Sequence, residues 1–486
     1  MNARVMVCGL FALRVSALLV AASVPAAAQQ PPQQDETKLG ADFRRERERF
    51  GEKCNGFNAK SLMGCATTLI TDHPLHLAVG SLAPQNGFGF GGAFVPPQMK
   101  PNDSWRINWS ADGVATPGGA WRAGAYATFV YTNVGGIDPT GPGGGTDPGD
   151  VPLHPYPTIG VFAQSTSLSK IFYYGLGNDS LRDSQTQYEM QQTTIGTRVA
   201  WPFGRSGFLG KLAPTAIGEL NGRWTDVGGS SKGPAPPIDA LFTDASAPGL
   251  AAQPATTQFG EGLRIAPVLG RFELAYTGLL QQYVAGSDAS FQRWTLDLGH
   301  VFRLSRTRGP AAERDHNGPN ECMTSVDRTV GVYGCPDPTL VTTNRVGSLG
   351  FRALVSESSV SGTNRVPFYF QRTLGGSDID GERLLASYDD YRFRGPKIFV
   401  LQETYEQAIW GPIGVFAMAE QGRVALTDQS LGDGTLHKTY GAGLSLRAGG
   451  TPMVTMWWAT GSGEGHHVAI RMSASLFGGG SRPSLK

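Results

Sequence analysis

The amino-acid sequence predicts an all-β protein: a transmembrane antiparallel β-barrel with a short N-terminal segment that is periplasmic or lies in the lumen. Three observations predict it: an export signal at the start, strands with one apolar and one charged face, and aromatic residues near strand ends. Of 486 residues, 66 are glycine and only 17% are charged, which suits many short strands joined by loops. A net charge of +1 gives no electrostatic case for nucleic acid as a partner.

Residues 1–28 have the pattern of a cleaved signal peptide. Arg4 precedes an apolar run from Val15 to Val24, and Ala26-Ala27-Ala28 supplies the small residues of a cleavage site. An N-terminal membrane anchor is the alternative, but the apolar run is short for a spanning helix. No later stretch is long and apolar enough for such a helix, so the membrane assignment depends on the strand patterns.

Residues 29–74 differ in composition from the rest. A Pro/Gln-rich stretch is followed by a charge-dense run in which Phe43 and Phe50 would share one helical face. We expect a partly flexible segment with a short charged helix, either solvated in the periplasm or folded into the lumen.

After cleavage four cysteines remain, and their closeness in sequence favours two disulfides in an oxidising compartment, Cys54–Cys65 and Cys322–Cys335. Free thiols are the alternative. Neither pair has the spacing of a zinc site, and we expect no metal.

Residues 75–477 alternate with a period of two. Trp294, Leu296 and Leu298 would share one face of a strand, and Arg293 and Asp297 the other. A soluble sandwich gives the same alternation, but three features favour a barrel: the number of strands, the aromatic residues at their ends, and long Gly/Pro loops alternating with short links. We expect 16 strands, with 12 or 14 possible, then a flexible tail over residues 478–486.

The loop lengths also suggest an orientation. The long Gly/Pro segments, Gly135 to Pro155 and Thr307 to Thr343, are typical of external loops, and the short links of periplasmic turns. The expected location is the outer membrane, as a multi-pass barrel. The expected partners are outer-membrane lipid, the barrel assembly machinery during biogenesis, and a protein or lipid substrate.

One stretch of the chain, from Val366 to Val424, carries a series of motifs. In order, they are Val366-Pro367-Phe368-Tyr369, Leu374-Gly375-Gly376-Ser377, Arg392-Phe393-Arg394-Gly395, Glu403, and Glu420-Gln421-Gly422-Arg423-Val424. This series resembles the bacterial surface-antigen family of BamA- and TamA-type outer-membrane barrels. The resemblance implies 16 strands and a loop that folds into the lumen. Residues 29–74 are too few for one POTRA module, so the resemblance is to a barrel-only member.

The loop motif departs from the family pattern. The family has an apolar residue, Arg, Gly and an aromatic, and its Arg pairs with an acidic residue on the barrel wall. Here the matching positions are Ile379-Asp380-Gly381-Glu382, with Asp380 in place of the Arg. The resemblance implies that Arg383 substitutes and pairs with Glu420, with Glu403 as a further lumen carboxylate, so that the loop is latched to the wall. The alternative is that these side chains face a water-filled lumen.

Two functions fit these observations. The first is insertion or translocation of protein or lipid at the outer membrane, and the second is a passive or plugged diffusion channel. We expect no enzyme activity, no catalytic residue and no cofactor. The run Gly229-Ser230-Ser231-Lys232-Gly233 matches a hydrolase nucleophile motif, but a proline-rich stretch follows it where that mechanism needs a helix.

Overall fold

A computed structural model describes residues 75–96, 98–133, 156–203, 212–269, 272–286, 288–304, 347–410, 413–448, 451–461, 463–464 and 466–472. All of them belong to one structural unit, residues 62–486. The predicted signal peptide, the segment 29–74, the tail 478–486 and the cysteines Cys54, Cys65, Cys322 and Cys335 lie outside the described residues.

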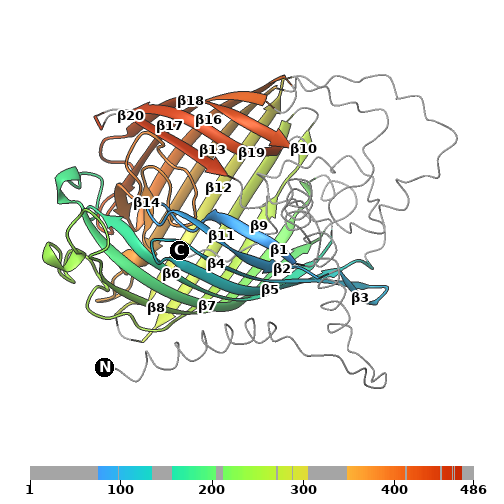
Figure 1. The fold of residues 1–486 in the computed structure, drawn as a ribbon, viewed down its shortest axis with the longest axis horizontal. Helices are drawn as coiled ribbons and strands as arrows, with labels where there is room; N and C mark the ends of the chain where they lie inside the picture. Colours follow the sequence, from blue (N-terminus) through green and yellow to red (C-terminus); the bar gives the residue numbers. More distant parts are fainter. Residues whose placement is uncertain are drawn as a thin grey trace, which may run out of the picture. The chain divides into compact units, whose positions relative to one another are not determined.

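The described residues build one large antiparallel sheet that curves into a barrel wall (Figure 1). Its first strands are β1 Leu75–Ser81, β2 Phe88–Phe94, β3 Met99–Asn102, β4 Trp105–Ala115, β5 Trp121–Tyr131, β6 Thr158–Tyr173, β7 Thr186–Pro202, β8 Thr215–Gly229, β9 Thr256–Ile265 and β10 Val268–Leu269. The remaining wall strands are β11 Phe272–Ala285, β12 Phe291–Arg303, β13 Gly347–Ser359, β16 Lys397–Trp410, β17 Ile413–Ala425, β18 His437–Ala448, β19 Thr451–Gly461 and β20 His466–Met472.

The wall corresponds to sixteen full strands. The sheet has 18 strands, but β3 follows β2 along the same side of β4, and β10 follows β9 along the same side of β11. Each of these two pairs therefore occupies one place in the wall, in agreement with the predicted 16. Among the described residues, β1 pairs only with β2 and β20 only with β19, so no hydrogen-bonded pairing between β1 and β20 closes the wall there.

The predicted alternation is confirmed, and its apolar face points outward. On β12, the side chains of Trp294 and Leu296 are 39% and 38% exposed, whereas Arg293 between the wall and the lumen contents is 1% exposed. A soluble sandwich would bury the apolar face, because water penalises its exposure. An outward apolar surface over fully paired strands is instead the arrangement that hydrocarbon requires, so the fold is a transmembrane barrel.

The distribution of long and short connections between the two ends of the wall differs from the one expected from the sequence. Connections in an antiparallel sheet alternate between its ends. The segments 134–155 and 305–346 connect strands at the same end as the two-residue links 411–412 and 449–450. The prediction that long Gly/Pro loops and short turns occupy opposite ends is therefore wrong for these two segments. Length alone does not determine the end, which depends on how many strands precede each loop.

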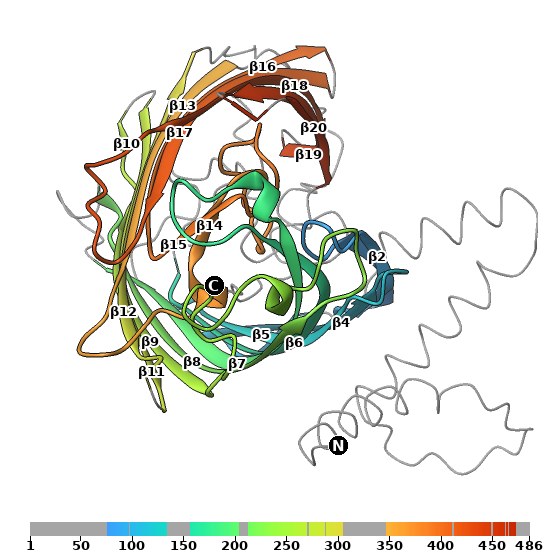
Figure 2. The same cartoon turned by 90° about the vertical axis from the view of Figure 1, so that its left-hand side faces the viewer.

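The buried core lies inside the ring of strands. Figure 2 shows the connection between β13 and β16 running through the interior, with its short strands β14 Arg372–Leu374 and β15 Phe393–Gly395 away from the wall. We call residues 360–396 the inward loop. Three short 3₁₀ helices, η2 Arg182–Ser184, η3 Ile238–Ala240 and η4 Phe368–Phe370, lie in loops at the end of the wall from which the inward loop enters. The lumen is thus packed by the chain's own loops.

Candidate functional site

The inward loop is the candidate functional site, and an aromatic cluster fixes its first half. The side chains of Phe368 and Phe370 in η4 are 0% and 1% exposed. The Phe368 ring packs edge-on against Tyr188 at 5.1 Å, and the Phe370 ring lies 5.5 Å from that of Tyr283. Burial of each Phe side chain stabilises this arrangement by roughly 2–3 kcal/mol. The segment Val366-Pro367-Phe368-Tyr369 therefore acts as the foot of the loop on the inner wall.

Two glycines shape the turn that follows. Gly375 has φ +106° and Gly376 has φ +57°, a backbone region that favours glycine. A Cβ on Gly375 would lie 2.5 Å from the Cβ of Arg392, so the backbone at Gly375 passes close to Arg392, further along the same loop. Asp390 completes the turn, because its carboxylate accepts hydrogen bonds from the Ser377 amide and from Gln85 Nε2, each at 2.8 Å. Burial raises the pKa of Asp390 above its ordinary value, although these two hydrogen bonds oppose the shift.

The tip of the loop is a tight turn around Asp378. The Asp378 carboxylate accepts hydrogen bonds from the amides of Asp380 and Glu382, at 3.0 and 2.7 Å, and Gly381 adopts φ +79°. The Glu382 carboxylate then lies 2.7 Å from Arg352 Nη2 on β13. Arg352 is itself held by Asp297 on β12, with contacts of 2.8 and 2.7 Å. Sequence analysis missed this contact, because nothing in the strand pattern of β13 marks Arg352 as a partner for the loop.

The residue after Glu382 makes the second wall contact. Arg383 Nε lies 3.5 Å from Glu420 Oε1 on β17, an ion pair without hydrogen-bond geometry. The Glu420 side chain is 0% exposed and accepts hydrogen bonds from the Ala386 amide at 2.7 Å and from Gln402 Nε2 at 2.9 Å. The Arg383 guanidinium also lies 5.1 Å from the ring centroid of Trp457. The structure thus brings Arg383 and Glu420 together, and their role as a latch remains a prediction.

The other two residues of the expected latch are placed differently. Asp380 lies in the tip turn, and it is Arg383 that meets Glu420. Glu403 does not face the loop. Successive strand side chains point to opposite faces, and its neighbour Gln402 points inward, where its Nε2 donates to the Arg383 carbonyl oxygen. Glu403 lies on the outer face with Leu401 and Tyr405, which are each 38% exposed. The expectation that Glu403 is a lumen carboxylate is therefore wrong.

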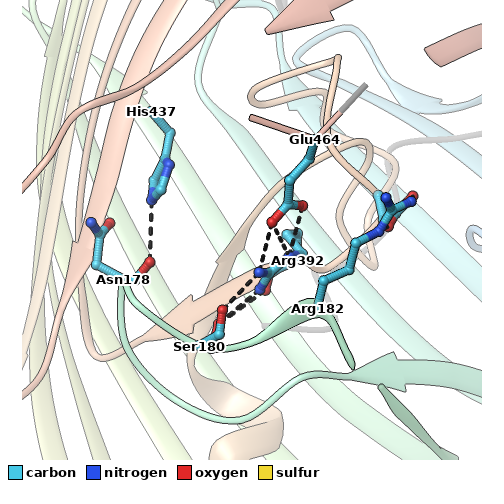
Figure 3. A network of polar contacts seen from close by, with 7 residues as sticks. Asn178, Ser180, Arg182, Arg392, His437 and Glu464 are labelled. Carbon is cyan, nitrogen blue, oxygen red and sulfur yellow. Dashed lines mark hydrogen bonds and ion pairs between the residues drawn. The ribbon is translucent and has the colours of Figure 1, made fainter. Parts of the chain in front are cut away.

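The second half of the loop is held by Arg392, whose side chain is 3% exposed. Its Nε and Nη2 atoms donate to the Glu464 carboxylate at 2.8 and 2.7 Å, and its Nη1 donates to Ser180 Oγ at 2.9 Å. Figure 3 shows Arg392 between Ser180, from the β6–β7 loop, and Glu464, from the β19–β20 hairpin. Its guanidinium also lies 4.5 Å from the ring centroid of Phe393. Arg392 therefore joins three chain segments that are distant in sequence.

Further polar contacts surround Arg392. Arg182 Nε lies 2.7 Å from the Asp389 carboxylate, and this hydrogen bond raises the pKa of Arg182. The Gly177 amide donates a hydrogen bond of 2.8 Å to the Arg394 carbonyl oxygen, which joins the β6–β7 loop to the inward loop. Asn178 accepts from the Val424 amide at 3.2 Å, and its carbonyl oxygen contacts His437 (Figure 3). These contacts form a polar cap over the inward loop.

Ser230, in the hydrolase-like motif, is 1% exposed and its Oγ donates to the Ser169 carbonyl oxygen at 2.6 Å. No cluster of metal-ligating side chains occurs among the described residues. None of the helices they form is long and apolar enough to span a membrane.

Wall and loop together define a class: an outer-membrane β-barrel whose lumen is occupied by an anchored inward loop. No family model matches the chain, and no curated protein matches its sequence. Among solved structures, the chain is similar to CdiB from Acinetobacter baumannii, with 9% identity, a TM-score of 0.45, and coverage of 82% of this chain and 58% of that one. For CdiB from Escherichia coli the values are 13%, 0.47, 83% and 63%.

A third similar structure is BamA from Haemophilus ducreyi lacking POTRA domains 1-3, with 10% identity, a TM-score of 0.46, and coverage of 82% of this chain and 69% of that one. The chain therefore spans about three fifths of the length of the CdiB chains it matches. These similarities are of fold alone.

Proposed function

We propose that this protein aids the insertion or translocation of protein or lipid at the outer membrane, with the inward loop as a movable plug. The observation that carries the proposal is how the loop tip is held. Glu382 and Arg383 form ion pairs with Arg352 and Glu420, on two different wall strands. Buried or half-buried ion pairs add little net stability when formed, but losing one partner leaves an uncompensated charge. Such contacts fix a position and can be exchanged, as a movable plug requires.

The contacts that hold the loop change from apolar at its foot to charged at its tip, which supports this proposal. The foot at Phe368 and Phe370 is apolar and fully buried, whereas the tip and the Arg392 end are held by charged groups. A substrate that offers charge to Arg352 or Glu420 would release the tip and leave the foot in place. The resemblance of this loop to the surface-antigen family supports the same function.

The test is single-channel conductance of the full-length protein in planar bilayers. We expect a small, flickering conductance for the unmodified protein and longer, larger openings for Glu420→Gln, because the Ala386 amide, Gln402 and Arg383 lose their charged partner. Glu273→Gln is the matched control, since Glu273 also faces the lumen and pairs with Arg303 at 2.6 Å, away from the loop. Equal effects of the two substitutions would contradict the plug model.

The competing function is a passive diffusion channel. It is favoured by the acidic tip, since Asp380 and Glu382 stand where the family carries Arg and an aromatic. A large, steady conductance of the unmodified protein, unchanged by Glu420→Gln, would identify it.

A further inference from the structure

Three arginine side chains lie on neighbouring elements of the inner wall, beside the foot of the inward loop. They belong to Arg223 on β8, Arg293 on β12 and Arg372 on β14, and the first two residues are 2% and 1% exposed. Arg223 Nε donates to Gln258 at 2.9 Å, and Gln258 pairs in register with Tyr283, whose ring centroid lies 5.4 Å from the guanidinium carbon of Arg293. Arg293 Nη2 donates to the carbonyl oxygen of Phe370, two residues before Arg372 in the inward loop, which places Arg372 on the same side of the wall.

Within the described part of the chain, no carboxylate neutralises this group. Among the described residues, none of the three arginines has an Asp or Glu oxygen within 4.0 Å. The acid that the hydrogen-bond network reaches is Glu219, which accepts from Gln258 at 3.2 Å and lies 3.4 Å from Arg198. Glu219 is thus shared with a further cation, and the described residues of the site carry an excess of positive charge.

Two donors of the group point to a missing acceptor. Arg223 Nη1 and Arg372 Nε are buried and have no hydrogen-bond acceptor among the residues that the structure describes. Arg293, by contrast, donates to Ser358 Oγ and to the Phe370 carbonyl oxygen. A buried charged donor without an acceptor is costly, so most such groups in proteins are satisfied. A bound oxyanion would supply both acceptor oxygens and negative charge.

We propose that Arg223, Arg293 and Arg372 form a binding site for a phosphate-type oxyanion. Guanidinium groups bind such oxygens with paired, charge-assisted hydrogen bonds, and three of them offer donors from three directions. The phosphate group belongs either to a free anion in the lumen or to a lipid headgroup. Because Arg372 lies on the loop and the other two on the wall, the bound anion ties the loop to strands β8 and β12.

The test uses purified full-length protein in a neutral detergent, with thermal unfolding followed at matched ionic strength. A ligand that binds only the folded state raises the melting temperature in a saturable way. We expect this with inorganic phosphate over chloride, and about tenfold weaker apparent binding in Arg372→Gln and Arg223→Gln. Arg372→Gln is the more informative variant, because this half-buried side chain makes no hydrogen bond to the described residues whose loss would impair folding.

Arg106→Gln is the matched control. Arg106 Nη1 donates to the backbone carbonyl oxygens of Asn102 on β3 and Trp105 on β4, so this substitution should leave phosphate binding unchanged. An equal shift in all variants would show a non-specific salt effect and overturn the proposal. A shift with dihexanoyl phosphatidic acid but with neither inorganic phosphate nor dihexanoyl phosphatidylcholine would assign the site to a lipid headgroup. No shift with any of them would also overturn it. This test does not measure conductance, so the anion site and the plug model are tested independently of each other.

Discussion

The Glu382 carboxylate lies 2.7 Å from the Arg352 guanidinium, and the next residue, Arg383, faces Glu420 across 3.5 Å. The loop tip thus presents one negative and one positive group in sequence, and the wall presents the complementary pair on β13 and β17. Arg352 also binds Asp297, so the Glu382 contact extends into a three-residue network along the wall.

Exchanging the charges of Glu382 and Arg352 tests whether their contact positions the loop. Each single change, Glu382→Arg or Arg352→Glu, places like charges at the contact, so we expect more frequent channel openings in planar bilayers. The double exchange should restore part of the closed state, because the attraction returns. Additive effects in the double variant would show that the two side chains act independently.

The Arg392–Glu464 pair should contribute more to stability than the neighbouring Arg182–Asp389 pair. The Arg392 side chain is 3% exposed and that of Arg182 is 53% exposed, so only the first leaves a buried charge when its partner is removed. We expect Glu464→Gln to lower the free energy of unfolding by roughly 3 kcal/mol. Asp389→Asn should cost under about 1 kcal/mol. Urea-induced unfolding in lipid vesicles would measure both, and equal losses would contradict this ranking.

Two glycines of the inward loop should respond differently to alanine. Gly375→Ala introduces a Cβ 2.5 Å from the Cβ of Arg392, in addition to backbone strain at φ +106°. We expect a loss of roughly 2–4 kcal/mol. Gly381→Ala has strain at φ +79° but no atom within 4 Å of the new Cβ, so about 1 kcal/mol is expected. The same unfolding assay compares them, and a tolerated Gly375→Ala would mean that the turn relaxes.

Asp390 should make the stability of the loop depend on pH. Burial raises its pKa above 3.8 in the folded protein, so the protonated form is favoured there. This contribution is fully present below pH 3.8 and is lost as the pH rises through the raised pKa. Asp390→Asn removes this titration. We therefore expect the melting temperature of the variant to rise relative to that of the unmodified protein as the pH increases through this window. A difference that stays constant across the window would show that Asp390 does not titrate there.

Much of the wall could be predicted from the sequence because a strand's alternation is local. Trp294 and Leu296 share a face opposite Arg293 in any extended conformation, and the low charge content favours an apolar exterior. The strand count and the inward loop followed from the resemblance of Val366 to Val424 to a known family of barrels. The proximity of Arg383 to Glu420 came from the same source, by matching the loop motif to this chain.

Other features were decided only by the tertiary structure. Glu403 is not one of them, because Leu401 and Tyr405 share its face of β16 and the alternation of the strand already indicated the outer face. The contacts of Glu382 with Arg352, of Arg392 with Glu464, and of Arg223 with Gln258 depend on strand pairing and on the path of the loop through the barrel. Sequence by itself determined which faces are apolar, because that property repeats every two residues. The charged contacts could not be read from it, because each joins segments whose proximity exists only once the wall is formed.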